Sequence, residues 1–396
     1  MTNTLPILSL QGAIQHYDWG GYHYIPQLLQ LPHSPQQPHA ELWMGTHNRG
    51  PASILNTSQT LDKWMQENPL ALGQENFEAY GPQLPYLFKV LDVRQMLSIQ
   101  AHPTKQQAEQ GFRHENEIGI PLTAFHRNYK DDNHKPELMV ALTDFWLLHG
   151  FKSASAINAM LQQQPEFAQQ LPAVKNGNIK ALYQYIMELP QTEVDQLLSP
   201  LKKRLEGGQY TKDQAHYWAQ RAFQEFRLDG GHYDRGIFSI YLFNIVHLQP
   251  GQGIYQAAGI PHAYLEGVNM EIMANSDNVF RGGLTKKHVD VPELLKSLIF
   301  ESITPKVLDG ARLDAIATHY PTPAKEFGLA KLQFPAQHTY TSTATSPEIL
   351  IVLEGRLRLE EQQLLSKGSI IFIPKGASYT LQAKDKSVAY KAFVPN

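Results

Sequence analysis

Short apolar runs closed by proline or glycine recur along most of the chain. Runs of this kind, bounded by turn-forming residues, are typical of β-strands. We predict strands in six of them: 86–92, 96–101, 138–142, 237–248, 348–353 and 369–373. The hydrophobic pattern therefore predicts a mainly β fold.

Residues 152–228 have a helical period instead. We predict that Thr211 caps one helix and that Thr192 with Asp195 forms a capping pair opening another over 193–205. We interpret the stretch as a helical insertion, in preference to a separate helical domain, because the β pattern resumes directly after it. Apolar residues spaced by three and four mark the buried face of the last helix: Ala215, Trp218, Ala219, Ala222, Phe223 and Phe226.

A weak internal repeat links residues 251–262 to residues 368–379. Each segment has two glycines eight residues apart around an apolar strand, and a polar ring three residues after the second glycine. That ring is His262 in the first segment and Tyr379 in the second. The strand–turn–strand pattern is typical of cupin-type double-sheet jelly rolls. If the alignment holds, the second copy has lost a metal-ligand position.

Composition then excludes several classes of protein. With 34 Lys+Arg against 37 Asp+Glu the formal net charge is −3, which argues against a nucleic-acid binder. No apolar run approaches the roughly 20 residues of a membrane span, and the N-terminus lacks the pattern of a signal peptide. Cysteine is absent, which fits a reducing cytoplasm. Any transition-metal site must therefore use the 17 histidines together with carboxylate and amide groups.

Residues 97–102 carry the strongest local signal for a site. On a strand, Ser98, Gln100 and His102 would share one face, with apolar residues on the other. A row of this kind suits the inside of a barrel mouth. A polar stripe on a solvent-facing edge would look the same, so both readings stay open on this segment alone.

Three further segments gather groups that can carry chemistry. Taken singly, each is explained equally well by solvated loop charges or by a structural histidine. Residues 129–137 include His134, Lys135 and Glu137; residues 261–264 include His262; residues 270–287 include Glu271, Asp277, Arg281 and Lys287.

Taken together, these segments resemble the type I phosphomannose isomerase family. The sequence carries Tyr-x-Asp-x-Asn-His-Lys-Pro-Glu at 129–137, His-Ala-Tyr-Leu-x-Gly at 262–267 and Glu-x-Met-Ala-x-Ser-Asp-Asn-x-x-Arg at 271–281. Residues 15–20 and 41–47 resemble the N-terminal strands of that family. One departure is Gly-Gly-Leu-Thr-Lys-Lys at 282–287, where the family usually has Ala-Gly-x-Thr-Pro-Lys. We expect an altered loop backbone there, with activity retained.

The resemblance implies one Zn²⁺ per chain, held by Gln100, His102, Glu137 and His262. Imidazole and carboxylate are ordinary zinc ligands. An amide, two neutral imidazoles and one carboxylate leave the site with a charge of about +1, which makes it a good electrophile. Two histidines with a carboxylate are also typical of non-haem Fe(II) enzymes, so an oxygenase of this fold is an alternative.

The resemblance also implies interconversion of mannose 6-phosphate and fructose 6-phosphate through a cis-enediol. Lys135 and Glu271 are the candidates for the group that moves the proton between C1 and C2. His134 and Asp277 are the candidates for ring opening. Arg281 would stabilise charge that appears only in the intermediate.

The substrate phosphate is assigned by resemblance to Lys89, Ser98 and Lys287. Lys89 lies in an apolar strand, where a charged residue is unusual. A short turn at 92–95 predicts an antiparallel hairpin that would bring Lys89 next to Ser98.

We therefore expect three units. Residues 1–151 and 229–305 form the catalytic, metal-binding roll, 152–228 the helical insertion, and 306–396 a second roll without metal ligands. The expected partner is a sugar phosphate, with no nucleic acid and no membrane, for a cytoplasmic monomer or weak homo-oligomer. The pathway is mannose catabolism or the supply of GDP-mannose. A non-catalytic sugar-phosphate sensor is the alternative from another class.

Overall fold

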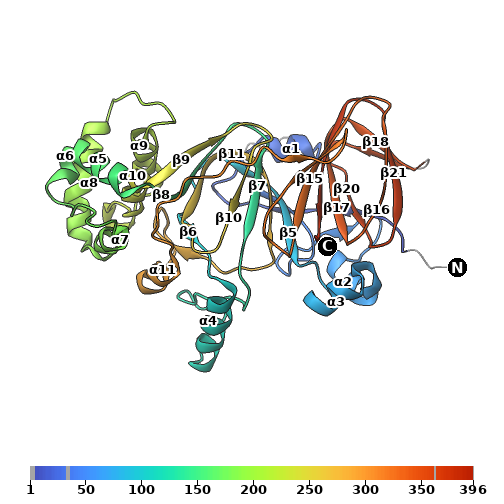
Figure 1. Cartoon of the computed structure of the whole chain (residues 1–396), viewed down its shortest axis with the longest axis horizontal. Coiled ribbons are helices and arrows are strands. Elements are labelled where there is room, and N and C mark those ends of the chain that lie inside the picture. Colours follow the sequence, from blue (N-terminus) through green and yellow to red (C-terminus); the bar gives the residue numbers. More distant parts are fainter. Residues whose placement is uncertain (1–4, 33–35, 361–362, 396) are drawn as a thin grey trace.

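The computed structural model describes residues 5–32, 36–360 and 363–395. Two β-rolls stand side by side, and a group of helices covers the end of the first roll (Figure 1). This mainly β, cupin-type architecture confirms the predicted fold class.

The first roll is built around one long strand, β11 (His262–Ala274), which runs through two sheets. Its second half pairs with β5 (Tyr86–Val93) and β7 (Glu137–Ala141). Its first half pairs with β6 (Gln100–Ala101) and β8 (Phe145–Phe151). The remaining strands of this roll are β2 (Ala13–Gln15), β3 (Glu41–Met44), β9 (Phe243–Leu248), β10 (Gly253–Gln256) and β12 (Phe280–Arg281).

The second roll consists of an eight-stranded sheet and a four-stranded sheet. In order across the larger sheet, the strands are β13 (Ala311–Arg312), β14 (Ala317–Tyr320), β15 (Gly328–Phe334), β22 (Ser387–Phe393), β17 (Glu348–Glu354), β20 (Ile370–Ile373), β1 (Leu8–Gln11) and β4 (Ser53–Ile54). The smaller sheet runs β16 (Thr339–Thr343), β21 (Ser378–Ala383), β18 (Arg356–Leu359) and β19 (Gln363–Ser366).

The first strand of the chain departs from the expected domain boundaries. Strand β1 pairs with β20 of the second roll, with Leu10 opposite Ile370, and β4 extends the same sheet edge. We expected all of residues 1–151 in the first roll. Strand pairing between distant segments leaves no local signal, so this exchange was invisible in the sequence.

Five consecutive helices fill the expected insertion, and α10 follows it. They are α5 (Ala154–Gln163), α6 (Pro165–Ala168), α7 (Ile179–Glu188), α8 (Gln191–Leu205) and α9 (Ala215–Glu225), followed by α10 (Gly236–Leu242). The others are α1 (Tyr24–Leu28), α2 (Leu61–Glu67), α3 (Gln74–Tyr80), α4 (Lys105–Glu117) and α11 (Val291–Ser297), with the 3₁₀ turns Pro69–Leu72 and Asp229–Gly231.

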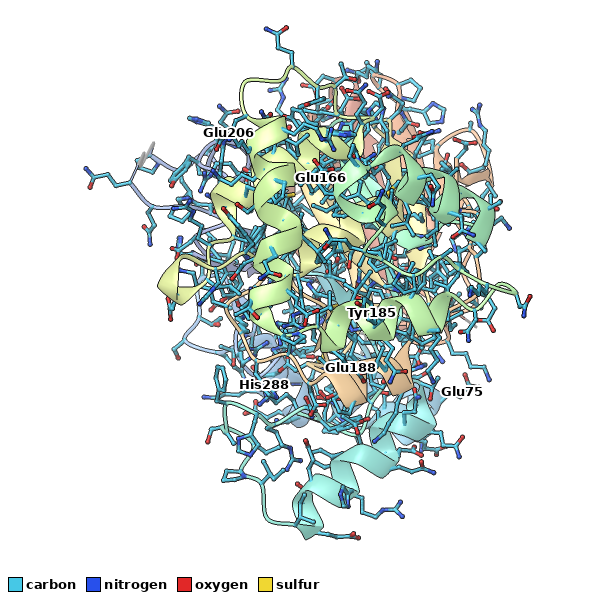
Figure 2. The ribbon with its side chains drawn as sticks, turned by 90° about the vertical axis from the view of Figure 1, so that its left-hand side faces the viewer. Glu75, Glu166, Tyr185, Glu188, Glu206 and His288 are labelled. Carbon is cyan, nitrogen blue, oxygen red and sulfur yellow. The ribbon has the colours of Figure 1, made fainter. Side chains whose placement is uncertain are left out.

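The helical end buries its apolar stripe against the first roll. Trp218, Ala219, Ala222 and Phe223 of α9 are buried, as their spacing predicted. Figure 2 views this end, where the exposed Tyr185, Glu188 and Glu206 lie on or directly after helices. None of the described helices is both long and apolar enough to cross a membrane.

Three local predictions were wrong. The run 237–248 begins as the helix α10, and only its second half is strand, because a fully buried apolar run has no period that separates helix from strand. Helix α9 begins after Gln214, and Thr211 does not cap it. Helix α8 already begins at Gln191, so Thr192 lies inside it and cannot cap it. The Asp195 carboxylate instead accepts hydrogen bonds from the Gln191 side chain and the Tyr233 N–H.

Strands β5, β7 and β11 are buried on both faces. On β7, Leu138 and Val140 join a core shared with the second roll, while Met139 and Ala141 face the interior of the first. Phe88 on β5 belongs to the shared core. Because this core lies between the two rolls, the second roll supports the strands that carry the side chains described below.

We predict that Phe88→Ala lowers the free energy of unfolding by about 3–5 kcal/mol, because it leaves a cavity in the shared core. Phe125, which is 73 % exposed, provides the control: Phe125→Ala should change stability by at most about 0.5 kcal/mol. Denaturant unfolding of both variants measures the difference. Equal effects would contradict the placement of Phe88 between the rolls.

Candidate metal centre and its surroundings

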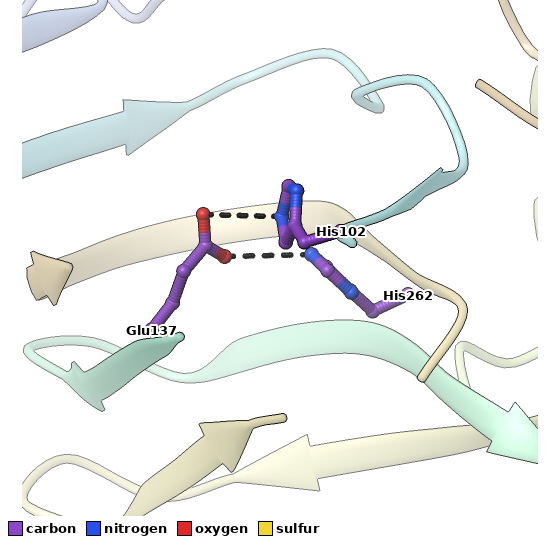
Figure 3. A group of neighbouring side chains, drawn as sticks. All are labelled: His102, Glu137 and His262. Carbon is purple, nitrogen blue, oxygen red and sulfur yellow. Dashed lines mark ion pairs between the residues drawn. The ribbon is translucent and has the colours of Figure 1, made fainter. Parts of the chain in front are cut away.

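Three buried side chains meet inside the first roll (Figure 3). The Nε2 of His102 lies 3.3 Å from Oε1 of Glu137, and the Nε2 of His262 lies 3.4 Å from Oε2 of the same carboxylate. Their ligand atoms all lie within 4.8 Å of one another. His102 directly follows β6, Glu137 begins β7 and His262 begins β11, so strand ends from both sheets supply the group.

Backbone carbonyls orient both imidazoles. The Nδ1–H of His102 donates to the carbonyl of Asn278 at 2.8 Å, and the Nδ1–H of His262 donates to the carbonyl of Ile260 at 2.9 Å. These bonds direct each Nε2 lone pair toward Glu137. Such bonds from the outer ring nitrogen are the usual way in which proteins fix a metal-binding histidine.

The electrostatics of the group fit a divalent cation. Burial lowers the pKa of His102 to about 4, so its imidazole is neutral near pH 7. Burial alone would raise the pKa of Glu137, but the neighbouring Lys135 holds it well below its usual range. The Nε2 of His102 is buried and makes no hydrogen bond to the described residues. Neutral imidazoles and an ionised carboxylate are what zinc requires.

Gln100, the fourth predicted ligand, lies on β6 directly opposite His262 on β11. On its other side Gln100 is opposite Arg281 on β12. The structure therefore places the backbone of the predicted amide ligand beside that of His262.

Lys135 lies next to the metal group, with its Nζ 2.9 Å from Oε1 of Glu137. A second buried pair lies deeper: Nζ of Lys89 is 2.5 Å from Oε1 of Glu271 and 3.6 Å from Oε2 of Glu41. Oε2 of Glu271 accepts a hydrogen bond from the Tyr264 hydroxyl at 2.7 Å. Burial opposes the charge of Lys89, but the two carboxylates raise its pKa and keep it protonated.

The predicted hairpin between Lys89 and Ser98 does not form. Strand β5 pairs with the second half of β11, with Lys89 opposite Glu271, whereas β6 pairs with its first half. The chain passes from one sheet to the other after Val93. Strands β5 and β6 therefore both pair with β11, but at different places along it. Strand β6 is also shorter than the predicted 96–101. Lys89 therefore contacts carboxylates, and the expected contact with Ser98 was wrong.

Asp277 is held by two residues that sequence reasoning missed. Nη2 of Arg49 lies 2.5 Å from Oδ1 of Asp277, and Nε2 of His47 lies 3.5 Å from the same oxygen. Burial alone would raise the pKa of Asp277, but His47, Arg49 and Lys135 lower it. The sequence motif at 41–47 included His47, whereas no local signal pointed to Arg49.

His134 is engaged outside this group. Its Nε2 lies 2.6 Å from Oε1 of Glu326, a residue of the second roll between β14 and β15. This ion pair links the rolls and competes with the ring-opening role predicted for His134.

A cationic group lies around the loop that follows β12. Arg281 and Lys287 pair with no carboxylate among the described residues, and burial lowers the pKa of Arg281. Burial lowers the pKa of Lys287 most, and repulsion from the nearby charges of Arg281 and Arg49 lowers it further. These three cations therefore face a common region. Ser98 directly precedes Ile99, whose N–H bonds to the carbonyl of Gly283 in the same loop at 3.0 Å.

Asp234, directly after the helical insertion, anchors that loop. Its buried carboxylate accepts the N–H groups of Leu284 at 2.8 Å and Thr285 at 3.0 Å. Gly283 has a φ of +111°, and a Cβ there would lie 2.5 Å from Gly236. The close contact with the start of α10 is therefore made by the glycine that matches the family pattern. The departure lies one residue earlier, at Gly282, where a Cβ would lie 2.9 Å from side-chain atoms of Ile99 and Tyr183.

Comparison with known proteins places the chain among sugar-phosphate isomerases. Residues 7–154 match the family model of the type I phosphomannose isomerase catalytic domain. Mannose-6-phosphate isomerase of Salmonella typhimurium is 37% identical over 382 residues, which cover 92% of this chain and 94% of the relative. The Escherichia coli enzyme is 36% identical over 387 residues, or 93% and 95% of the two chains.

Solved structures agree. The Salmonella typhimurium enzyme bound to its substrate, fructose 6-phosphate, and to zinc has a TM-score of 0.88 and 32% identity, over 99% of this chain and 100% of that chain. A zinc-bound mannose 6-phosphate isomerase has a TM-score of 0.87 over the same shares.

We predict that His262→Ala lowers the zinc content from about one per chain to near zero, because removing one imidazole leaves too few ligands for tight binding. Elemental analysis of dialysed protein measures the content. His338→Ala removes an exposed histidine of the second roll and is the matched control. Full zinc content in folded His262→Ala protein would remove His262 from the ligand set.

Proposed function

Because the chain belongs to the type I phosphomannose isomerase family, we propose a role for each residue of its site in the interconversion of mannose 6-phosphate and fructose 6-phosphate. The chain is a zinc-dependent aldose–ketose isomerase. Membership of this family argues against the two alternatives, an Fe(II) oxygenase and a non-catalytic sugar-phosphate sensor. The single observation that carries the residue assignments is the convergence of His102, Glu137 and His262 inside one roll.

We assign the zinc ligands to Gln100, His102, Glu137 and His262. The convergence of the last three and the register of Gln100 opposite His262 support this set. When bound, Zn²⁺ supplies Lewis-acid polarisation of a substrate oxygen. The remaining steps fall to side chains that surround the metal group.

We assign proton transfer between C1 and C2 to Lys135. Its Nζ lies 2.9 Å from a carboxylate oxygen of Glu137, directly beside the metal group, and as a neutral amine this nitrogen can accept the proton from carbon and return it to the neighbouring carbon. In Glu271, the other candidate, one carboxylate oxygen contacts Lys89 and the other accepts the Tyr264 hydroxyl. A group that moves a proton needs a free position within hydrogen-bond reach of the substrate, and this favours Lys135.

We assign ring opening to Asp277 in preference to His134. Contacts with Arg49 and His47 favour the ionised carboxylate of Asp277, which suits it to accept a hydroxyl proton. The imidazole of His134 is engaged by Glu326.

We assign stabilisation of the enediolate to Arg281. Its guanidinium stands across the strand pair from Gln100 and has no carboxylate partner among the described residues. A donor that meets its negative charge only in the intermediate lowers the barrier without tightening the binding of substrate.

We assign the substrate phosphate to Ser98 and Lys287, and we replace Lys89 by Arg49 in this set. The two carboxylates beside Lys89 neutralise it, and we assign it to holding Glu271. Arg49 is more than half exposed and lies close enough to Lys287 to lower its pKa. A phosphate dianion would relieve the mutual repulsion of these cations.

We further propose that the enzyme acts in the cytoplasm, as a monomer or a weak homo-oligomer. The absence of cysteine from the sequence supports a reducing compartment. Mannose catabolism and GDP-mannose supply both use this reaction, and the proposal applies to either.

We predict that Arg281→Ala lowers kcat by about a hundredfold or more, because the positive charge that meets the enediolate is lost. Steady-state kinetics with mannose 6-phosphate measure the change. Lys286→Ala, in the same loop but exposed, should leave kcat unchanged. A rise in KM alone would make Arg281 a binding residue and would refute the assignment.

We predict that Arg49→Ala raises KM for mannose 6-phosphate about tenfold or more, the loss expected for one charge-assisted bond to phosphate. Zinc content should stay at one per chain, which separates this effect from loss of the metal. Arg113→Ala on the exposed face of α4 is the control. An unchanged KM would remove Arg49 from the phosphate site.

A further inference from the structure

The second roll contains a buried ion pair at its centre that the isomerase reaction does not use. Nζ of Lys391 lies 2.9 Å from Oε1 of Glu348, and the Tyr379 hydroxyl donates to Oε2 of Glu348 at 2.8 Å. Lys391 also lies 3.3 Å from the Tyr379 hydroxyl. All three side chains are at least nine-tenths buried: the exposed fractions are 8 % for Lys391, 4 % for Glu348 and 1 % for Tyr379.

The strand pairings of the two rolls correspond residue by residue. In the first roll, Glu137 begins β7 and is opposite Gln256 on β10. In the second, Glu348 begins β17 and is opposite Ile373 on β20. The glycines that flank β10 and β20 follow the same offset, and all four have φ between +78° and +92° (Gly251, Gly259, Gly368 and Gly376). Glu348 is therefore the counterpart of Glu137.

The other sheet of each roll gives the same offsets. His262 is opposite Gln100 in the first roll, and Tyr379 is opposite Ser342 in the second. One backbone hydrogen bond recurs as well. The Gly259 N–H donates to the backbone carbonyl of His102 at 2.9 Å, and the Gly376 N–H donates to the backbone carbonyl of Ala344 at 2.7 Å. Ala344 is thus the counterpart of His102.

Lys391 occupies a defined place in this correspondence. Glu271 is opposite Met139 in the first roll, and Lys391 is opposite Leu350, two residues into the matching strand, in the second. Of the four ligand positions, only that of Glu137 still carries a carboxylate, which is Glu348. The position that corresponds to Glu271 carries the cationic side chain of Lys391. The complete correspondence is Gln100 with Ser342, His102 with Ala344, Glu137 with Glu348, His262 with Tyr379 and Glu271 with Lys391.

We propose that the Lys391 ammonium takes the place of the metal ion in the second roll, so that this roll is a metal site filled by a built-in cation. A buried carboxylate needs a partner of opposite charge. In the first roll Lys135 contacts one oxygen of that carboxylate, and two imidazole Nε2 atoms lie beside the carboxylate, where an exchangeable ion can bind. In the second roll no imidazole lies at the matching positions, and the chain supplies the charge with Lys391 alone. The shared core then rests on a roll whose integrity does not depend on zinc.

Rebuilding the ligand set tests this directly. The substitutions Ser342→Gln, Ala344→His and Tyr379→His restore the three lost ligands, and Lys391→Ala clears the cation. We expect the fourfold variant to bind two zinc ions per chain in place of one, measured by elemental analysis after dialysis. The matched control keeps Lys391 with the same three ligand substitutions, and it should bind only one.

Two results would overturn the proposal. If the control also bound two zinc ions, Lys391 would not occupy the metal position. If the fourfold variant kept isomerase activity and a cooperative thermal transition yet bound one, the second roll would not be a counterpart of the metal site. Because the first site is untouched, failure here is distinct from failure of the zinc assignment in the first roll.

A smaller change serves if the fourfold variant does not fold. In Lys391→Ala/Tyr379→His, added Zn²⁺ should raise the temperature of thermal unfolding above that of the same protein without added zinc. Glu348→Gln in that background should abolish the rise, since the retained carboxylate is the remaining anionic ligand. Lys331→Met, on neighbouring β15 and without a salt bridge among the described residues, should respond to zinc as the unmodified chain does. No rise in the double variant would contradict the proposal.

Discussion

The carboxylate of Glu137 is the point on which the site depends. Its two oxygens face His102 and His262, and Lys135 contacts one of them. A buried carboxylate with three such neighbours stays ionised, and this makes the pocket attractive to a divalent cation. The backbone of Glu137 begins β7, whose next residue enters the core shared with the second roll. The charge that defines the chemistry is therefore fixed in position by packing on the opposite face of the same strand.

The surrounding charges are arranged in pairs, with two exceptions. Lys89 and Glu271 are buried and balance one another. Arg49 contacts Asp277 but is more than half exposed, so it can also contact the substrate phosphate that we assign to it. Arg281 and Lys287 have no anionic partner among the described residues, and they are available to an anionic substrate. The loop that carries them is tied by Asp234 to the end of the helical insertion. The segment that follows the helical insertion thus helps to position the two cations that we assign to the substrate, although it contributes none of the predicted metal ligands.

The two rolls compensate a buried glutamate charge in different ways. Each buries one glutamate at the start of a central strand, and each must compensate that charge. The first roll places Lys135 beside one oxygen and two imidazoles around the carboxylate, and the Nε2 atoms of these imidazoles can bind a cation. The second places a lysine on it and leaves the tyrosine hydroxyl to complete the hydrogen bonds. A roll compensated from within can serve as a constant support for one that must gain and hold an ion.

The sequence by itself determined the family, the mainly β architecture and the helical stretch, because these rest on local periodicity and on ungapped motifs. Two of the proposed ligands, Glu137 and His262, stand in those motifs, whereas Gln100 and His102 stand five and three residues before α4. It also identified the repeat that relates the two rolls. The tertiary structure decided what local pattern cannot encode: β1 lies in the second roll, Lys89 faces Glu271 and not Ser98, His134 pairs with Glu326, and Arg49 reaches Asp277. Each of these depends on which distant strands share a sheet and in what register. Register is set by the burial of whole faces and leaves no trace in the residues immediately around any one of them.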